Sequence, residues 1–204
     1  AMDYQAVGLG AFGNYVVAVT DGHPYIASGA HPSSMTFRKM ETPRPSACVS
    51  ARGIVEMGRS VIYPSDEGLI RVSNGCVDPL TDAIFTEAQW RALKPETIFA
   101  TRYQDKYLAF HQDAAGDWQA FMVDEGGQGM IELAPLADGQ VPTGAWTDPA
   151  TGNVMLAVDD PVDGAVLMRL DDDAADPLEY AWRSKEFESP KPVNMAAAMI
   201  RADA

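Results

Sequence analysis

Four turn glycines constrain the fold most strongly, because they recur at a nearly constant interval along the chain. Each follows an apolar run and an acidic or small residue, and they are Gly22, Gly68, Gly116 and Gly164. Successive members of this set are 46, 48 and 48 residues apart, a period typical of β-propellers and other repeat arrays. The spacing predicts four copies of one structural unit.

Each unit is predicted to hold four short strands. The runs on either side of the turn glycine form a hairpin, with a shorter run before it and a more variable run after it. The expected first strands are 7–12, 53–57, 97–103 and 143–147. The expected hairpins are 15–19 with 24–27, 61–63 with 69–72, 107–110 with 118–123, and 154–158 with 165–170. The expected last strands are 35–40, 76–80, 130–133 and 178–187, and four strands per unit match a propeller blade.

These patterns predict an all-β chain, a β-propeller or partial propeller of four four-stranded antiparallel blades. The hairpin strands are apolar on both faces, as expected where sheets stack face to face. The alternative is a β-sandwich, which would not require the regular period. The prediction treats 1–204 as one propeller-like domain with repeats of about 1–50, 51–96, 97–142 and 143–190, and an extra strand in 191–204. Its apolar run 195–200 resembles the inner strand of a fifth unit or a strand that closes the ring. The alternative that the chain is an excised part of a larger propeller therefore stays open.

One short helical insertion is predicted between the second and third units, at 86–93. Thr86 and Gln89 have the spacing of a capping box, and Pro95 marks the end of the helix. Trp90 and Leu93 are expected to pack onto the edge of a blade.

The charge balance excludes some partners. Lys and Arg number 15 against 29 Asp and Glu, so the net charge is −14, which opposes binding to nucleic-acid phosphates or anionic lipids. We therefore expect no sequence-specific nucleic-acid binding. No apolar run reaches the roughly 20 residues of a transmembrane helix, so no membrane span is expected. Cys48 and Cys76 show neither zinc-site nor disulfide-framework spacing, and both are expected to be buried thiols.

No residue is predicted to be catalytic, cofactor-binding or metal-binding, and the chain is not expected to be an enzyme. The three histidines lie in different segments without a recognised motif, and structural or surface roles are expected for His23, His31 and His111. Two aspartate groups could supply oxygen ligands for calcium, although aspartate also favours turns. They are Asp159, Asp160 and Asp163, and Asp171, Asp172, Asp173 and Asp176.

Two further sets bear on carbohydrate chemistry. No spacing selects a glycosidase pair among Glu132, Glu179, Glu186 and Glu188. Aromatic side chains could form sugar-binding platforms, but core packing between blades is the expected role of Trp118, Trp146, Trp182, Tyr103 and Tyr107.

Three segments resemble virion structural proteins of tailed bacteriophages. They read GRSVIYPSDEGLIRV at 58–72, IFTEAQW at 84–90, and YAWRSKEF with PKPVN at 180–187 and 190–194. The resemblance implies a tail or nozzle-type component with a β-propeller domain, which scaffolds tail assembly and DNA passage without catalysis. It also implies an oligomer in the virion that contacts other tail or portal-region subunits, after synthesis in the bacterial host cytoplasm. The resemblance supplies no catalytic residues, cofactors or metals.

The expected docking segments are loops, at 29–34, 125–129 and 135–143, which interrupt the repeat with polar residues and glycine. The alternative function is a carbohydrate-binding or glycan-cleaving propeller at a cell surface.

Overall fold

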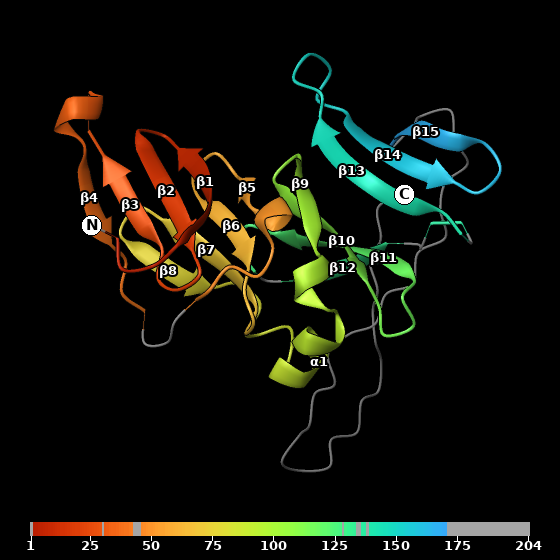
Figure 1. Cartoon of the computed structure of the whole chain (residues 1–204), viewed down its shortest axis with the longest axis horizontal. Coiled ribbons are helices and arrows are strands. Elements are labelled where there is room, and N and C mark those ends of the chain that lie inside the picture. Colours follow the sequence, from red (N-terminus) through yellow and green to blue (C-terminus); the bar gives the residue numbers. More distant parts are fainter. Residues whose placement is uncertain are drawn as a thin grey trace, which may run out of the picture.

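The computed structural model describes residues 2–29, 31–42, 46–127, 129–133, 136–137 and 139–170. Within these residues the chain forms four antiparallel sheets and one short α-helix (Figure 1). The predicted all-β fold is confirmed.

Each sheet is a meander whose strands lie side by side in chain order. The first sheet contains β1 (Ala6–Phe12), β2 (Tyr15–Thr20), β3 (Tyr25–Ser28) and β4 (Thr36–Lys39). The second contains β5 (Val55–Glu56), β6 (Val61–Pro64), β7 (Leu69–Ser73) and β8 (Cys76–Pro79). The third contains β9 (Phe99–Tyr103), β10 (Lys106–Gln112), β11 (Trp118–Asp124) and β12 (Met130–Leu133). The fourth contains β13 (Val141–Thr147), β14 (Val154–Asp160) and β15 (Gly164–Arg169), and its expected last strand at 178–187 lies outside the described residues.

The sheets are stacked as successive blades, not as the two sheets of a sandwich. The first strand of each sheet contacts the first strand of the next, from β1 to β5, β5 to β9 and β9 to β13. Figure 1 shows these strands gathered in the middle, with β4 at one end of a fan and the fourth sheet at the other. No comparable contact joins the first and fourth sheets among the described elements, so this part of the chain is an open propeller-like array. The segment 191–204 lies outside the described residues.

Three hydrophobic cores fill the spaces between neighbouring sheets. Strand β6 shows why its residues are apolar on both faces. Val61 and Tyr63 belong to the core shared with the first sheet, whereas Ile62 belongs to the core shared with the third. Because successive side chains of a strand point to opposite faces, a central blade buries all three.

Each repeat glycine lies in the predicted hairpin of its sheet, with Gly22, Gly68 and Gly116 in the turn between the second and third strands and Gly164 as the first residue of the third strand. Gly164 has a φ of 74°, a left-handed conformation that favours glycine. Gly22 has no positive φ. A Cβ atom there would lie 2.2 Å from the Tyr4 ring, so close approach of an aromatic side chain requires glycine at this turn.

The predicted helix is present as α1 (Glu87–Ala92), and its capping box is confirmed. The Gln89 backbone N–H donates to Thr86 Oγ1 at 3.3 Å, and the Thr86 N–H donates to Gln89 Oε1 at 2.9 Å. Trp90 is fully buried in the core between the second and third sheets, and Leu93 packs against the same core. Pro95 begins the 3-10 turn η3 (Pro95–Thr97), so the helix ends before it as predicted.

Two local predictions were wrong. Cys76, at the start of β8, is exposed, whereas Cys48 is buried as expected. Strand β5 has two residues in place of the expected 53–57, because the 3-10 turn η2 (Ala51–Gly53) takes up the start of that segment. Tyr107 Oη donates to the Gly53 carbonyl at 2.8 Å and fixes this turn from the next sheet.

A search of the described residues for a helix both long and apolar enough to cross a membrane finds none.

Candidate functional site

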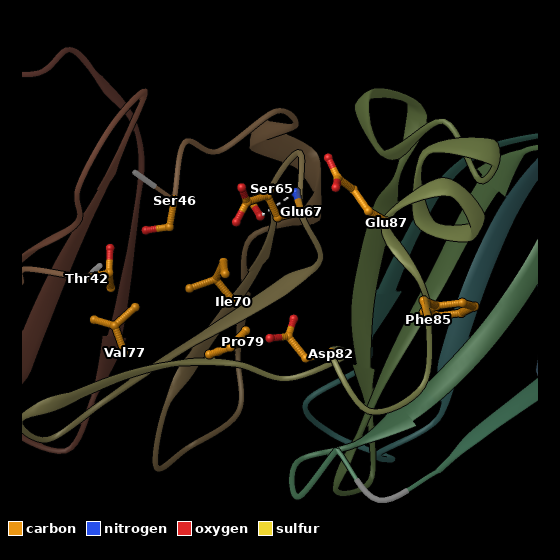
Figure 2. A pocket seen from close by; sticks show the side chains of 10 residues that line it. All are labelled: Thr42, Ser46, Ser65, Glu67, Ile70, Val77, Pro79, Asp82, Phe85 and Glu87. Carbon is orange, nitrogen blue, oxygen red and sulfur yellow. Dashed lines mark hydrogen bonds between the residues drawn. The ribbon is translucent and has the colours of Figure 1, made fainter. Parts of the chain in front are cut away.

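The larger cavity, of about 460 Å³, lies beside the second sheet. It is bounded by the segment after β4, by the hairpin of β6 and β7, by β8, and by the segment that leads into α1 (Figure 2). We call it the α1 cavity. Its lining consists of Thr42, Ser46, Ser65, Glu67, Ile70, Val77, Pro79, Asp82, Phe85 and Glu87.

Hydrogen bonds fix the two serines of the α1 cavity in place. Ser65 Oγ donates to the Gly68 carbonyl at 2.9 Å and accepts the Glu67 N–H at 3.2 Å, which closes the turn after β6. Tyr63 Oη donates to the Ser46 carbonyl at 3.0 Å. Burial raises the pKa of Tyr63 well above its usual range, so its hydroxyl stays protonated. Tyr63 Oη also lies 3.1 Å from Ser46 Oγ, so both serine hydroxyls are held in place.

The remaining lining combines an apolar surface with carboxylates. Ile70, Val77, Pro79 and Phe85 supply the apolar part. Glu67, Asp82 and Glu87 supply carboxylates, and Glu87 also pairs with Arg91 at 2.5 Å. Carboxylates and fixed hydroxyls beside an aromatic ring suit a ligand with several hydroxyls or a cationic group next to an apolar body.

A second cavity, of about 290 Å³, lies where the first strands of three sheets meet. Of its two charged residues, Glu56 connects two of these strands. Glu56 Oε1 accepts the Ala11 N–H at 2.7 Å, which joins β5 to β1. Arg102 Nε donates to the Gln104 carbonyl at 2.6 Å within the turn after β9. The Glu56 carboxylate therefore links the first two sheets at the centre of the array.

The histidines lie on separate elements. His23 is half-buried, with Nδ1 3.1 Å from Thr42 Oγ1, and His31 is exposed beside Ser33. His111, on β10, is buried against the Phe121 ring, 5.6 Å between ring centres. Burial lowers the pKa of His111, so the neutral imidazole is favoured.

The carboxylates of the fourth sheet hold its turn. Asp160 Oδ1 accepts the Val162 and Asp163 N–H groups at 2.8 and 3.0 Å, and Gln140 Nε2 donates to Asp160 Oδ2 at 2.8 Å. These bonds, led by the one from Gln140, lower the pKa of Asp160. Within the described ranges, no group of three His, Cys, Asp or Glu residues is placed to hold a metal ion.

Glu132, one of the four candidate glutamates, is exposed on β12. The second aspartate group and the remaining glutamates lie outside the described residues, namely Asp171, Asp172, Asp173, Asp176, Glu179, Glu186 and Glu188.

The aromatic candidates divide between core and surface. Tyr107 is fully buried, and Trp118 is half-buried with its ring 5.6 Å from that of Phe99. Tyr103 packs at the margin of the core between the third and fourth sheets. Trp146, by contrast, is 44% exposed, which differs from the expected core role. Trp182 lies outside the described residues.

The outer face of the first sheet, turned away from the second sheet, is apolar. Directly paired residues of antiparallel strands share a face, and the pairs Leu9 with Ala18 and Ala27 with Phe37 lie on this one. Leu9 and Phe37 are 69% and 62% exposed. The face is made up of Leu9, Ala11, Val16, Ala18, Tyr25, Ala27, Phe37 and Lys39.

The outer face of the fourth sheet, turned away from the third sheet, is apolar as well. Trp146 pairs with Met155, and Ala157 pairs with Leu167, which is 56% exposed. One carboxylate and one guanidinium lie among its apolar side chains, and the face consists of Val141, Gly144, Trp146, Met155, Ala157, Asp159, Ala165, Leu167 and Arg169. The sequence-based expectation of docking loops did not include these two faces. The signal was present, since β2 and β14 are apolar at successive positions.

Comparisons with known proteins show a distant structural likeness and no family. No protein family matches the chain, and no curated protein matches it. Among solved structures, TolB from Acinetobacter baumannii superposes with a TM-score of 0.40 at 13% sequence identity. The match covers 82% of this chain but 45% of the TolB chain, so it spans less than half of that protein.

Proposed function

We propose that this protein is a non-catalytic assembly component of a phage or prophage tail. The observation that carries the assembly role is the pair of exposed apolar outer faces on the first and fourth sheets. Large apolar side chains gathered on a surface mark protein–protein contact sites, and Leu9, Phe37 and Leu167 are each more than half exposed. The partners are other tail or portal-region subunits, including further copies of this chain.

The tail setting rests on the sequence resemblance at 58–72, 84–90, 180–187 and 190–194. The net charge of −14 is compatible with it, because an acidic protein beside a DNA passage repels phosphates and does not retain them. The proposed location is the virion tail, reached after synthesis in the host cytoplasm.

Particle analysis tests this function. We expect the protein in purified virions of the phage or induced prophage that encodes it, detected by mass spectrometry and located on the tail by immunogold electron microscopy. An amber mutation in its gene is expected to give incomplete, non-infectious tails. Complete infectious particles without the protein would refute the proposal.

A second candidate, carbohydrate binding, is favoured by the lining of the α1 cavity, where Phe85 lies with Asp82 and the fixed Ser65 hydroxyl. A glycan array tests it. Binding that is lost in Phe85→Ala and retained in Trp146→Ala would place a sugar in this cavity. No binding to any glycan would remove the candidate, and release of reducing sugar would add cleavage to it.

A further inference from the structure

The three interfaces between neighbouring sheets all run in the same direction along the chain. The second and third sheets each turn one face toward the sheet that follows and the opposite face toward the sheet that precedes. The contact between the first and second sheets illustrates the fit. Gly10 on β1 faces Val61 on β6, so the branched valine side chain fits against a glycine of the neighbouring sheet.

The two outer faces are the members of this series that lack a neighbouring sheet among the described residues. The outer face of the first sheet corresponds to the face that, in the second and third sheets, contacts the sheet before it. Its two central strands carry Ala18 and Ala27, 5% and 1% exposed, together with Val16 and Tyr25, and the larger Leu9 and Phe37 project from the flanking strands. At one end the N-terminal segment packs on this face, where the Asp3 N–H donates to Tyr25 Oη at 2.9 Å.

The outer face of the fourth sheet corresponds to the face that, in the second and third sheets, contacts the sheet after it. Large side chains project from it, with Trp146 44% and Leu167 56% exposed. The opposite face of the same sheet places Leu156 and Val158 in the core shared with the third sheet. One chain therefore carries both halves of a further interface of the kind that it already contains three times.

We infer that two copies of this chain associate head to tail, the outer face of the fourth sheet of each packing on the outer face of the first sheet of the other. Two different patches on one subunit form a heterologous contact, which makes a closed ring when the rotation closes. Two copies of four sheets give eight, within the usual range of four to eight blades. The inference depends on the proposed assembly role but not on the tail setting.

Sedimentation of the full chain and two charge variants tests this arrangement. We expect the native protein at tens of micromolar to have twice the 22.0 kDa mass of one chain. Leu9→Glu and Leu167→Glu each place an unpaired carboxylate in the apolar contact, so each should weaken association by about 100-fold or more. Both side chains are more than half exposed, so the circular dichroism spectrum of each folded variant should be unchanged, and its melting temperature should fall only by the stabilisation that the dimer contributes. Val162→Glu, in the exposed turn before β15, is the matched control and should remain a dimer.

Mixing the two variants separates head-to-tail contact from symmetric contact. Leu9→Glu keeps an intact fourth-sheet face and Leu167→Glu keeps an intact first-sheet face, so the mixture should form a one-to-one dimer that neither variant forms alone. A monomeric native protein, a dimeric Leu9→Glu or Leu167→Glu variant, or a mixture that stays monomeric would overturn the inference. Particles larger than a dimer would overturn the two-copy ring. Absence of the protein from virions would refute the tail function and leave the dimer intact.

Discussion

At the scale of single residues, the two cysteines show how position in a sheet sets chemical behaviour. Cys48 lies between the first two sheets, where it forms an isolated bridge with Ser65 and its Sγ donates to the Ser50 carbonyl at 3.3 Å. Burial raises the pKa of Cys48 to about 11. Cys76 begins an outer strand directly after the turn glycine Gly75 and is exposed. The Asn74-Gly75 turn was the signal in the sequence that this strand begins at the surface.

Thiol titration checks this difference. Because the thiolate is the reactive form, we expect one thiol per native chain to react with Ellman's reagent at pH 8, and the second only after denaturation. Cys76→Ser should remove the rapid reaction, whereas Cys48→Ser should retain it. Two rapid thiols in the native protein would contradict the buried position of Cys48.

His111 is expected to make stability depend on pH. Burial lowers its pKa most, opposed by backbone contacts with Gln112 and Leu93 and by the Asp113 and Glu132 carboxylates. Its Nδ1 atom has no hydrogen-bond partner among the described residues. A lowered pKa means that the unfolded state binds the proton more readily. The stabilisation is therefore complete above the unfolded value of about 6.5 and is lost as the pH falls toward the lower folded value.

Urea unfolding between pH 7.5 and pH 5 measures this effect. The native protein should lose stability as the pH falls, with a slope of at most about 1.4 kcal/mol per pH unit for one proton. His111→Gln cannot take up the proton and should flatten the slope in this window. His31→Gln, at an exposed position, should keep the native slope. Equal slopes in all three proteins would exclude His111 as the source.

At the scale of elements, the repeat in the sequence predicted most strands, and tertiary contacts account for the differences. The observed β12 coincides with the expected 130–133, and β9 to β11 differ from their expected ranges by one or two residues at most ends. Strand β5 is short because a bond from Tyr107 holds Gly53 in a 3-10 turn. That partner is 54 residues away, so no local pattern could indicate it.

The repeat glycine Gly164 offers a test of turn geometry. Its φ is 74°, and a Cβ atom added there would have nothing within 4 Å, so substitution costs backbone strain alone. Gly164→Val should lower the free energy of unfolding by about 1–3 kcal/mol. Gly164→Asn should cost less, because asparagine tolerates the left-handed conformation better than a β-branched residue. Chemical denaturation measures both, and equal losses would exclude the conformational explanation.

At the scale of the whole molecule, the α1 cavity and the outer faces arise from the stacking of the units, which limits how far the sequence could predict them. The lining of the α1 cavity extends from Thr42 to Glu87 and combines residues of two units with the segment entering the helix. No motif joins them, and α1 is fixed beside the second sheet by Trp90, whose Nε1 donates to the Ser65 carbonyl at 2.7 Å. The sequence period predicts the order of the sheets, and this order determines which sheets lie at the two ends of the array. How exposed their outer faces are depends on whether another chain or segment packs on them.

Arg52 connects three units of the array. It lies in η2 before the second sheet, its guanidinium lies 4.7 Å from the centre of the Phe99 ring on β9, and its Nη2 donates to the Thr143 carbonyl on β13. In a stacked array each unit is stabilised mainly by its neighbours. The fourth sheet has one neighbouring sheet among the described residues, the third. Loss of the Arg52 side chain should therefore destabilise the fourth sheet more than the other sheets.

Arg52→Ala is accordingly expected to weaken one end of the array selectively. Removing an exposed cation–π contact and a charged hydrogen bond should cost about 1 kcal/mol. Opening of the fourth sheet would then be about fivefold more frequent. Hydrogen exchange followed by mass spectrometry should show faster exchange in β13 to β15 and unchanged exchange in β1 to β4. Arg59→Ala, at another exposed arginine beside the second sheet, controls for loss of charge and should change neither. Faster exchange spread evenly over all four sheets would mean that the array unfolds as one cooperative unit, in which the link from Arg52 has no local effect.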